Sequence, residues 1–438
     1  MSTDRNLQRQ FYEMLMESQW WSTDQIRGYQ RSQLGQLLHH ARTNVPFYER
    51  RLDAALKPNG DVDWERWLEI PIVTRRDMIV HRDAMQAREL PRGHGPTAVL
   101  HTSGSTGVAI DVTVSAIGAI ANTGLRWRAN RWQELDWSKT LCVALGDQAH
   151  AHHWPDGEPK GFWGPPWDAS ARQGGAWKLS RSFDSSYLFE FMKEHDCAYL
   201  NTGPNMAHIN ALDARRLGIE VRIEAILVQG NVVHQADRDI CREVFGAKLV
   251  EFYSSKEGGQ IAHPCNLGRL HVNSETCLVE VLDENDVPVK PGEQGRVIVT
   301  PIFETAQPLI RYDQGDLVTL GDDCPCGRKG PTILAVHGRS IAIFRHPDGT
   351  AVAKLMPEDT AAMLSATRWQ LAQVGPLAFE MRYMPVSPDA YADESSVREI
   401  FSRTYFLDAE LIFVRSDDIA STHAGKVAEY INEWNPVK

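Results

Sequence analysis

A stretch rich in glycine and hydroxyl groups offers the clearest chemistry in the sequence. It reads HTSGSTGVAIDV from His101 to Val112. Its glycines let consecutive backbone N–H groups point inward, and its serines and threonines add hydroxyl donors, which suits phosphate oxygens. It lacks the lysine of a Walker loop and the spacing of a dinucleotide fingerprint, so its positive charge must come from a metal ion or from distant residues. Taken alone, the stretch also fits a plain turn.

Two loops further along carry carboxylates next to features suited to a nucleotide. In EFYSSKEGG, Tyr253 offers an aromatic face for a base, and Glu257 offers a carboxylate for Mg²⁺, which needs only one or two from the protein. In RYDQGDL, Asp313 and Asp316 flank a glycine turn, where one carboxylate can accept hydrogen bonds from both ribose hydroxyls. Each carboxylate alone also fits a solvated loop or turn.

Two cations near the C-terminus are candidates for the missing charge. Arg339 lies in HGR, and Lys426 lies in THAGKVAEYI, on a glycine-marked loop that we expect to enter a helix. Singly, both also fit surface charges. Their order after the glycine-rich loop favours a shared nucleotide site.

A cysteine and histidine set has the composition of a zinc site. Cys265 and His271 are followed by Cys324 and Cys326, and three thiols with one imidazole suit tetrahedral zinc. Four protein ligands leave no open position, which predicts a structural ion. Reduced cysteines in two polar turns are the alternative, and His263 is a competing ligand.

The hydrophobic patterns indicate the elements that position these residues. The first hundred residues read as helices, with Leu34, Leu37, Leu38 and Ala41 at helical spacing before Pro46. TLCVALG, AYLNTG, EAILVQG and AKLVEFYSS then predict strands, each followed by a helical pattern, in an α/β sheet with functional loops at the strand ends. From about residue 270, CLVEVLD and GRVIVTPI predict an antiparallel hairpin or small barrel. A break near HGRSIAIF predicts a separate small α+β domain.

Composition excludes several classes of protein. The chain has 438 residues, 42% hydrophobic and 24% charged, which is typical of a soluble globular protein of two or three domains. The formal net charge of −11 argues against nucleic acid as a partner. No signal layout and no run near the roughly 20 apolar residues of a membrane span occurs. We expect a cytoplasmic protein without a membrane partner, and a homodimer stays open. Seven unevenly spread cysteines do not suggest disulfides.

The motif order resembles the adenylate-forming superfamily of acyl-CoA ligases, and within it the phenylacetate-CoA ligase-like branch. TSGSTG, YSSKEGG, RYDQGD, a Gly-Arg and a Gly-Lys near the C-terminus occur in the family's order, and ARTNVPFYERRL and IPIVTRRDM resemble the same branch. The resemblance covers essentially the whole chain. It implies an N-terminal α/β domain over 1–338, with a helical start and a β subdomain at about 270–335, and a mobile C-terminal domain over 339–438.

The resemblance also implies a role for each motif residue. Tyr253 would pack on adenine, Asp316 would hold the ribose, and Glu257 would hold Mg²⁺. Lys426 would stabilise the adenylation transition state. Gly230 and Asn231 of VQGNVV would line the adenine edge, with Arg339 near the hinge. The residues implied to cradle the ATP phosphates are Thr102, Ser103, Gly104, Ser105, Thr106 and Gly107.

The function implied is ATP-dependent activation of an aromatic or heteroaromatic carboxylic acid as an acyl-adenylate, with release of pyrophosphate and transfer to coenzyme A. Transfer to an amine, a carrier protein or another nucleophile is an alternative, and a non-catalytic zinc-stabilised nucleotide-binding protein is a third hypothesis.

The sequence departs from the family's motifs in three places. Val108 and Ala109 replace the usual Lys and Pro, GRSIAI lacks the acidic pair after Gly-Arg, and Lys256 replaces a small or polar residue.

In the family, the segment between the phosphate loop and VQGN lines the acyl pocket. Here that segment contains HAHHWPDGEPKGFWGPPW, which also fits a surface loop pinned by its aromatics. No cationic residue stands out in it as a carboxylate anchor. The candidate wall residues are His153, Trp154, Phe162, Trp163 and Trp167, with Asn205 of LNTGPN as a second wall.

Overall fold

The computed structural model of the chain describes residues 2–57, 59–101, 110–146, 157–172, 174–180, 185–339, 344–347, 351–352, 356–357, 360–417, 419 and 429–434. Several predicted site residues therefore lie outside the described residues: the loop at 102–107, His153, Trp154 and Lys426. Arg339 is described only by its backbone.

The chain begins with two long helices, as the spacing of apolar residues predicts. They are α1 (Ser2–Ser18) and α2 (Thr23–Asn44). Ser22 begins α2 in a capping box, because its hydroxyl accepts from the Gln25 backbone N–H and the Gln25 side chain accepts from the Ser22 N–H. The face predicted to be apolar is buried, and α2 ends just before Pro46. Shorter helical turns follow at Pro46–Tyr48, Asp53–Ala55, Trp64–Glu69 and α3 (Arg75–Val80).

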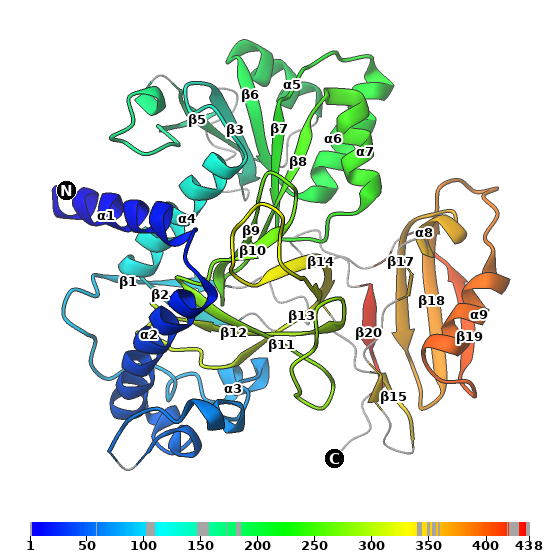
Figure 1. Ribbon diagram of the computed structural model, residues 1–438. Helices are drawn as coiled ribbons and strands as arrows, with labels where there is room; N and C mark the ends of the chain where they lie inside the picture. The colour runs from blue at the N-terminus through cyan, green and yellow to red at the C-terminus, as the bar shows by residue number, and fades with distance from the viewer. Residues whose placement is uncertain are drawn as a thin grey trace.

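One sheet of twelve strands forms the centre of the molecule (Figure 1). All four strands expected from apolar runs are present and parallel to one another. They are β3 (Thr140–Gly146), β6 (Cys197–Thr202), β7 (Ala225–Gln229) and β8 (Lys248–Ser255). The strands β5 (Ala176–Ser180) and β4 (Glu158–Gly161) complete this edge, and the helices packed on it are α5 (Ser185–Glu194), α6 (Pro204–Leu217) and α7 (Gln235–Phe245).

One of the predicted strand-to-helix steps is wrong. After β8 the chain turns back directly into the antiparallel strand β9 (Gly259–Pro264). Gly259 permits this reversal with a φ of 68°. The tight return replaces a helix because β9 pairs with β8 itself. Residues 147–156, which follow β3, lie outside the described residues, and the next described strands are β4 and β5.

The predicted hairpin is confirmed, but it does not form a barrel apart from the main sheet. The strands β11 (Cys277–Leu282) and β12 (Gln294–Pro301) pair antiparallel. They continue the same sheet through β13 (Tyr312–Leu320), β14 (Thr332–Arg339), β10 (Leu270–Val272) and β9. The hydrophobic alternation is the same in a hairpin, a barrel and an extended sheet, so the sequence could not separate them.

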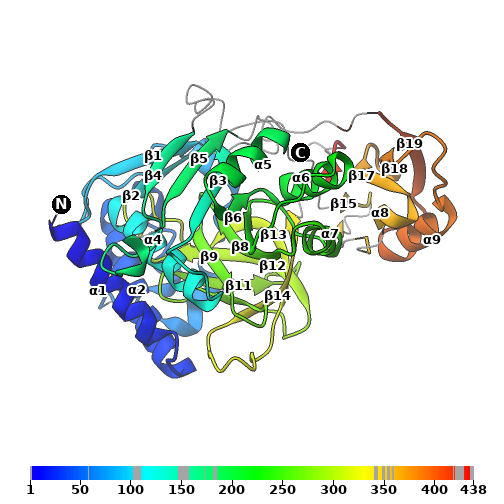
Figure 2. The same ribbon diagram turned by 90° about the horizontal axis from the view of Figure 1, so that it is seen from above.

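The C-terminal residues form a separate small sheet with its own core, at the right of Figure 1 and in Figure 2. Its strand order is β19-β18-β17-β20. The predicted helix after Lys426 is wrong over 430–432, where the chain forms β20 beside β17. The elements are β15 (Phe344–Arg345), β16 (Ala351–Val352), α8 (Thr360–Met363), β17 (Ala366–Gln373), β18 (Ala378–Pro385), α9 (Glu394–Thr404), β19 (Glu410–Arg415) and β20 (Tyr430–Asn432).

A buried ion pair ties the N-terminal helix to the sheet. The helix α4 (Ala116–Trp132) follows the hairpin of β1 (Thr97–His101) and β2 (Asp111–Ser115). Its Arg128 donates to Glu275 at 2.6 Å and to Asn273 at 2.9 Å, and Ser18 of α1 donates to the same Glu275 at 2.5 Å. Burial works against the Glu275 carboxylate, but Arg128 outweighs it and lowers the pKa. None of the described helices is long and apolar enough to cross a membrane.

We expect Arg128→Met to destabilise the fold by about 3–5 kcal/mol, because it leaves Glu275 charged and buried without its partner. The double variant Arg128→Met, Glu275→Gln should recover part of this loss, since the orphaned charge is gone. Urea denaturation measures both. Arg66→Met, at the exposed Arg66–Glu69 pair, is the control and should change stability little. Equal losses in the single and double variants would contradict this account.

Candidate active site

A large cavity opens at the ends of β7 and β8, between the main sheet and the C-terminal unit. It encloses about 2040 Å³, whereas a site for one small molecule typically encloses about 300–1,000 Å³. Its wall combines Gln229 and Tyr253 of the main sheet with Met356, Arg368 and Trp369 of the C-terminal unit. The cavity therefore has room for more than one substrate, and the two parts of the chain share it.

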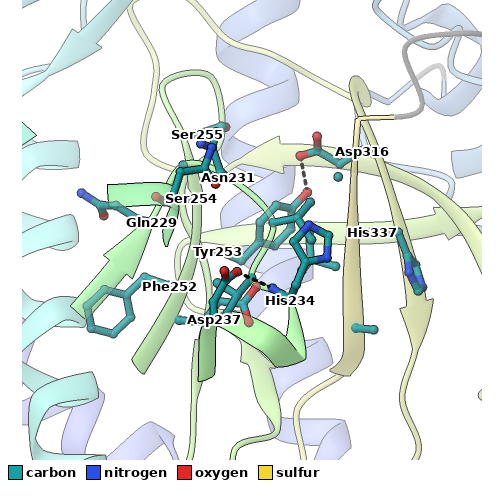
Figure 3. A pocket seen from close by; sticks show the side chains of 18 of the residues that line it. Gln229, Asn231, His234, Asp237, Phe252, Tyr253, Ser254, Ser255, Asp316 and His337 are labelled. Carbon is teal, nitrogen blue, oxygen red and sulfur yellow. Dashed lines mark hydrogen bonds between the residues drawn. The ribbon is translucent and has the colours of Figure 1, made fainter. Parts of the chain in front are cut away.

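The cavity brings together Tyr253, which is predicted to pack on adenine, and Asp316, which is predicted to hold the ribose. The Tyr253 hydroxyl donates to the Asp316 carboxylate at 2.8 Å (Figure 3). Asp316 pairs in register with Arg339 across β13 and β14, so the backbone of the predicted hinge residue lies beside it. A carboxylate fixed in this way can accept hydrogen bonds from vicinal hydroxyls, next to an aromatic ring.

The loop after β7 also lies where the sequence predicts. Gly230 takes a φ of 94°, which a side chain would strain, and Asn231 follows it on the cavity wall. The next residue, Val232, fills the space over Gly338, where an added Cβ would come within 2.6 Å of Val232 Cγ2. This close packing joins the predicted adenine loop to the strand that leads to the C-terminal unit.

Glu257 fits a cation. Its side chain is only 2% exposed, and Oε1 is buried without a hydrogen-bond partner among the described residues. Arg75 approaches that oxygen no closer than 3.9 Å. A buried carboxylate oxygen in this state needs a partner, and a hard divalent cation such as Mg²⁺ is the partner that carboxylates suit.

The neighbouring Lys256 brings a positive charge to the start of the predicted phosphate loop. Its ammonium group donates to the backbone carbonyl of His101, the residue just before that loop. His101 in turn contacts Asp111, which also pairs with Arg82. The lysine that departs from the family pattern thus places a cation next to a loop that has none of its own.

The four predicted zinc ligands lie together. Their ligand atoms are all within 4.8 Å of one another. Cys265 Sγ lies 3.8 Å from Cys324 Sγ, and Cys326 Sγ lies 3.3 Å from His271 Nε2. Tetrahedral zinc with bonds of about 2.3 Å to sulfur separates two thiolates by about 3.8 Å, so the set fits this ion.

The charges around the set favour metal-binding forms of two of its members. Burial and nearby arginines lower the pKa of His271 to about 4, which keeps the imidazole neutral. Burial works against the Cys326 thiolate, but hydrogen bonds from Arg328 help to lower its pKa overall. Burial raises the pKa of Cys324 to about 11, so that thiol would need the ion itself to ionise.

His263 does not compete for the ion. Its ring lies outside the four-residue set, with Nε2 at 2.8 Å from Gln260 and Nδ1 at 3.4 Å from Asn273. Burial holds the pKa of His263 well below its usual value. It is a neutral core histidine, packed edge-on against Phe252 at 5.0 Å.

Three of the aromatic residues predicted to line the acid pocket are described, and Phe162, Trp163 and Trp167 lie elsewhere. Trp163 donates its indole N–H to the Lys139 carbonyl at 2.9 Å and packs on Tyr199, and Trp167 packs on Trp127. Phe162 is 55% exposed and is not among the described residues that line the cavity. The two tryptophan rings pack against the core, which accounts for their types. Asn205, the second-wall candidate, does line the cavity.

Several charged residues of the cavity wall were missed by the sequence reasoning, and Arg126 and Glu304 are two of them. Arg126 of α4 lies one helical turn after Asn122, and both line the cavity. Glu304 lies after β12, where its carboxylate accepts from the Ser115 backbone N–H at 2.8 Å. The only sequence signal for Arg126 is its helical spacing from Asn122, and none marks Glu304.

Glu304 makes the stability of the fold depend on pH. Burial raises its pKa from 4.5 to about 6. The folded state then binds more protons than the unfolded state between these values, so stability falls as the pH rises through this window and stays lower above it. We expect Glu304→Gln to raise the free energy of unfolding at pH 8 by up to about 2 kcal/mol, with no gain below pH 4.5. Urea denaturation at a series of pH values measures the free energy of unfolding, and Glu284→Gln, at an exposed carboxylate, is the control. A gain in stability that is the same at every pH would contradict the assignment to Glu304.

The comparisons with known proteins agree with this geometry. No protein-family model matches the chain. A phenylacetate-coenzyme A ligase of Thermus thermophilus is 24% identical over 339 residues, 72% of this chain and 71% of that protein. A 2-hydroxyisobutyryl-CoA ligase in complex with an acyl-adenylate superposes with a TM-score of 0.69 at 18% identity, covering 94% of this chain and 91% of the other.

The o-succinylbenzoate CoA synthetase of Bacillus subtilis, solved with its acyl-adenylate intermediate, also matches, with a TM-score of 0.51 at 16% identity over 76% of this chain and 67% of its own. The resemblance found in the motifs is thereby confirmed. The chain is a homologue of phenylacetate-coenzyme A ligase and has the mixed α/β fold of the adenylate-forming acyl-CoA ligases.

Proposed function

We propose that this protein uses ATP to activate a carboxylic acid as an acyl-adenylate, releases pyrophosphate, and transfers the acyl group to coenzyme A. One observation carries the proposal: Tyr253 and Glu257 of one segment and Asp316, 63 residues after Tyr253, line a single cavity with the loop of Gly230 and Asn231. That set supplies a ring for a base, an acceptor for ribose hydroxyls and a carboxylate for Mg²⁺.

The reaction pairs two anions, because a carboxylate attacks the α-phosphorus of a triphosphate. Positive charge must therefore be aimed at the transferring group. Mg²⁺ held by Glu257 would supply charge at the phosphates. Lys256 lies at the edge of the loop at 102–107. Lys426 is the proposed source of the remaining charge, and Arg339 is proposed to contact the nucleotide.

The C-terminal unit is proposed to move during the cycle. Residues 356–357, 361–362 and 365–369 of that unit line the same cavity as the main sheet, and the two parts meet at the strand that ends in Gly338 and Arg339. A moving domain can bring Lys426 in only when the substrates are bound, and can then open a path for coenzyme A. A related ligase was solved with both an acyl-adenylate and coenzyme A, which supports transfer to this acceptor.

The cysteine and histidine set is proposed to hold a structural zinc ion. It would tie the end of β9, through Cys265, to the loop after β13, through Cys324 and Cys326. Those elements carry the residues next to Glu257 and Asp316. The ion would thus fix two nucleotide ligands relative to each other without taking part in the reaction.

We expect the purified protein to release pyrophosphate from ATP when a suitable acid is added, over a panel of aryl, heteroaryl and aliphatic acids with and without coenzyme A. Lys426→Ala should abolish release while ATP binding remains. Asp316→Asn should raise KM for ATP by about 10-fold or more, because a charge-assisted hydrogen bond to the ribose is weakened. Lys193→Ala, at an exposed lysine of α5, is the control.

Release that survives in Lys426→Ala would exclude the proposed role of that lysine. An absence of acid-dependent release with every acid would exclude adenylation. Release without consumption of coenzyme A would favour an amine or carrier protein as the acceptor.

We expect Cys326→Ser to lower zinc content, melting temperature and ATP affinity together, since the same ion would fix the fold and the nucleotide ligands. Metal analysis, thermal denaturation and nucleotide titration measure the three. Cys197→Ser, a buried cysteine outside the set, is the control and should keep its zinc. Less than roughly half a zinc per chain in freshly purified protein would remove the proposed site.

A further inference from the structure

An arginine inside the cavity has no partner among the described residues. Arg126 lies on the face of α4 that Gly118, Ala119 and Asn122 also present to the cavity. The next arginine along, Arg128, donates to Glu275 and Asn273. No hydrogen bond or ion pair of Arg126 is found in the described part of the chain, although five N–H donors of a guanidinium need acceptors.

The Arg126 side chain faces the cavity rather than bulk solvent. It is accessible, yet the surrounding protein desolvates its guanidinium and lowers its pKa. A side chain that projects into a cavity can be both accessible and partly surrounded by protein. The guanidinium is therefore a charged group on the cavity wall that is open to a ligand.

The two faces of β8 separate Arg126 from the nucleotide residues. Phe252 and Tyr253 are adjacent in β8, so their side chains point to opposite faces. Phe252 packs in the core that includes Ala129 of α4, whereas Tyr253 packs in the other core and binds Asp316. Figure 3 shows Phe252 pointing away from Tyr253 and Asp316. Arg126, on α4, belongs to the Phe252 face.

The position of Arg126 along α4 suits the end of the acid that lies farther from Glu257. Asn122 accepts from the Gln260 backbone N–H at 3.2 Å, directly after the glycines that follow Glu257. Arg126 comes one turn later, about 6 Å along the helix axis. Gln229 lies on the same side of the sheet, in register with Phe252, and adds an amide to the wall.

We propose that Arg126 binds a second carboxylate of the acid substrate, so that this protein activates dicarboxylic acids. The inference rests on the proposed adenylation. One carboxylate of the substrate lies near Glu257 and reacts, while the other accepts a bidentate hydrogen bond from the guanidinium. The planar fork of an arginine matches a carboxylate in this way.

Matched pairs of acids that differ by one carboxylate test the proposal: phenylacetate with 4-carboxyphenylacetate, butanoate with succinate, and hexanoate with adipate. In acid-dependent pyrophosphate release, the wild type should favour at least one diacid over its partner by about 10- to 100-fold in kcat/KM. Arg126→Met should remove this preference by raising KM for the diacid much more than KM for its monoacid partner. Arg126→Lys should restore part of it, because charge remains but the fork is lost. Arg131→Met, at the Asp168 pair on the outside of the same helix, is the control.

Calorimetric titration of the same diacids into wild type, Arg126→Met and Arg126→Lys measures their binding affinity without any reaction. If no acid gives pyrophosphate, the proposed adenylation fails, and diacid binding that Arg126→Met abolishes still supports the arginine site. If the wild type turns over monoacids and Arg126→Met leaves the diacid ratio unchanged, the arginine site fails and adenylation stands. If the melting temperature of Arg126→Lys is unchanged, a change in its KM does not come from a loss of structure.

Discussion

The sharp reversal of the chain between β8 and β9 is the constraint on which the site depends. Gly258 donates its N–H to the Ser255 hydroxyl at 2.7 Å, and Gly259 takes a positive φ against Asn122, where an added Cβ would lie 3.0 Å from Oδ1. Because β9 then pairs with β8, the parallel and antiparallel strands become one sheet. The reversal sets Glu257 at the turn and places β13, with Asp316, opposite Tyr253.

Charge in the cavity is divided between two regions. Around the predicted nucleotide position the described wall is anionic, with Glu257 and Asp316, which suits ribose hydroxyls and a divalent cation. The phosphates that this cation accompanies need further positive charge, and Lys256 begins to supply it at the carbonyl of His101. On the α4 side, Arg126 adds a cation that has no partner among the described residues. This arrangement suits the two anionic substrates that we propose, ATP and the acid.

Local patterns predicted those parts of the structure that local chemistry decides. The apolar runs before Gly or Ser became the parallel strands, and Tyr253 and Asp316 were found because motif order names them. The continuous sheet, the strand β20 and the burial of Trp163 depend on contacts between distant segments, which hydrophobic alternation does not encode. The sequence did not indicate Arg126 as a cavity residue for the same reason. On a helix of mixed polarity, only the positions of β8 and β9 decide which face lines the cavity.

The pleat of β8 separates the proposed nucleotide side of the cavity from the side of Arg126. Its side chains alternate, so Tyr253 and Phe252 lie in different cores, with Asp316 on the Tyr253 side and α4 on the Phe252 side. A substitution on the Phe252 face can therefore change which acid fits without moving the Tyr253–Asp316 hydrogen bond. Since α4 contributes the rest of that wall, through Gly118, Asn122 and Arg126, the acid pocket can diverge along one helix while the activation chemistry stays with the strand ends. Low overall identity with a shared fold is what such an arrangement permits.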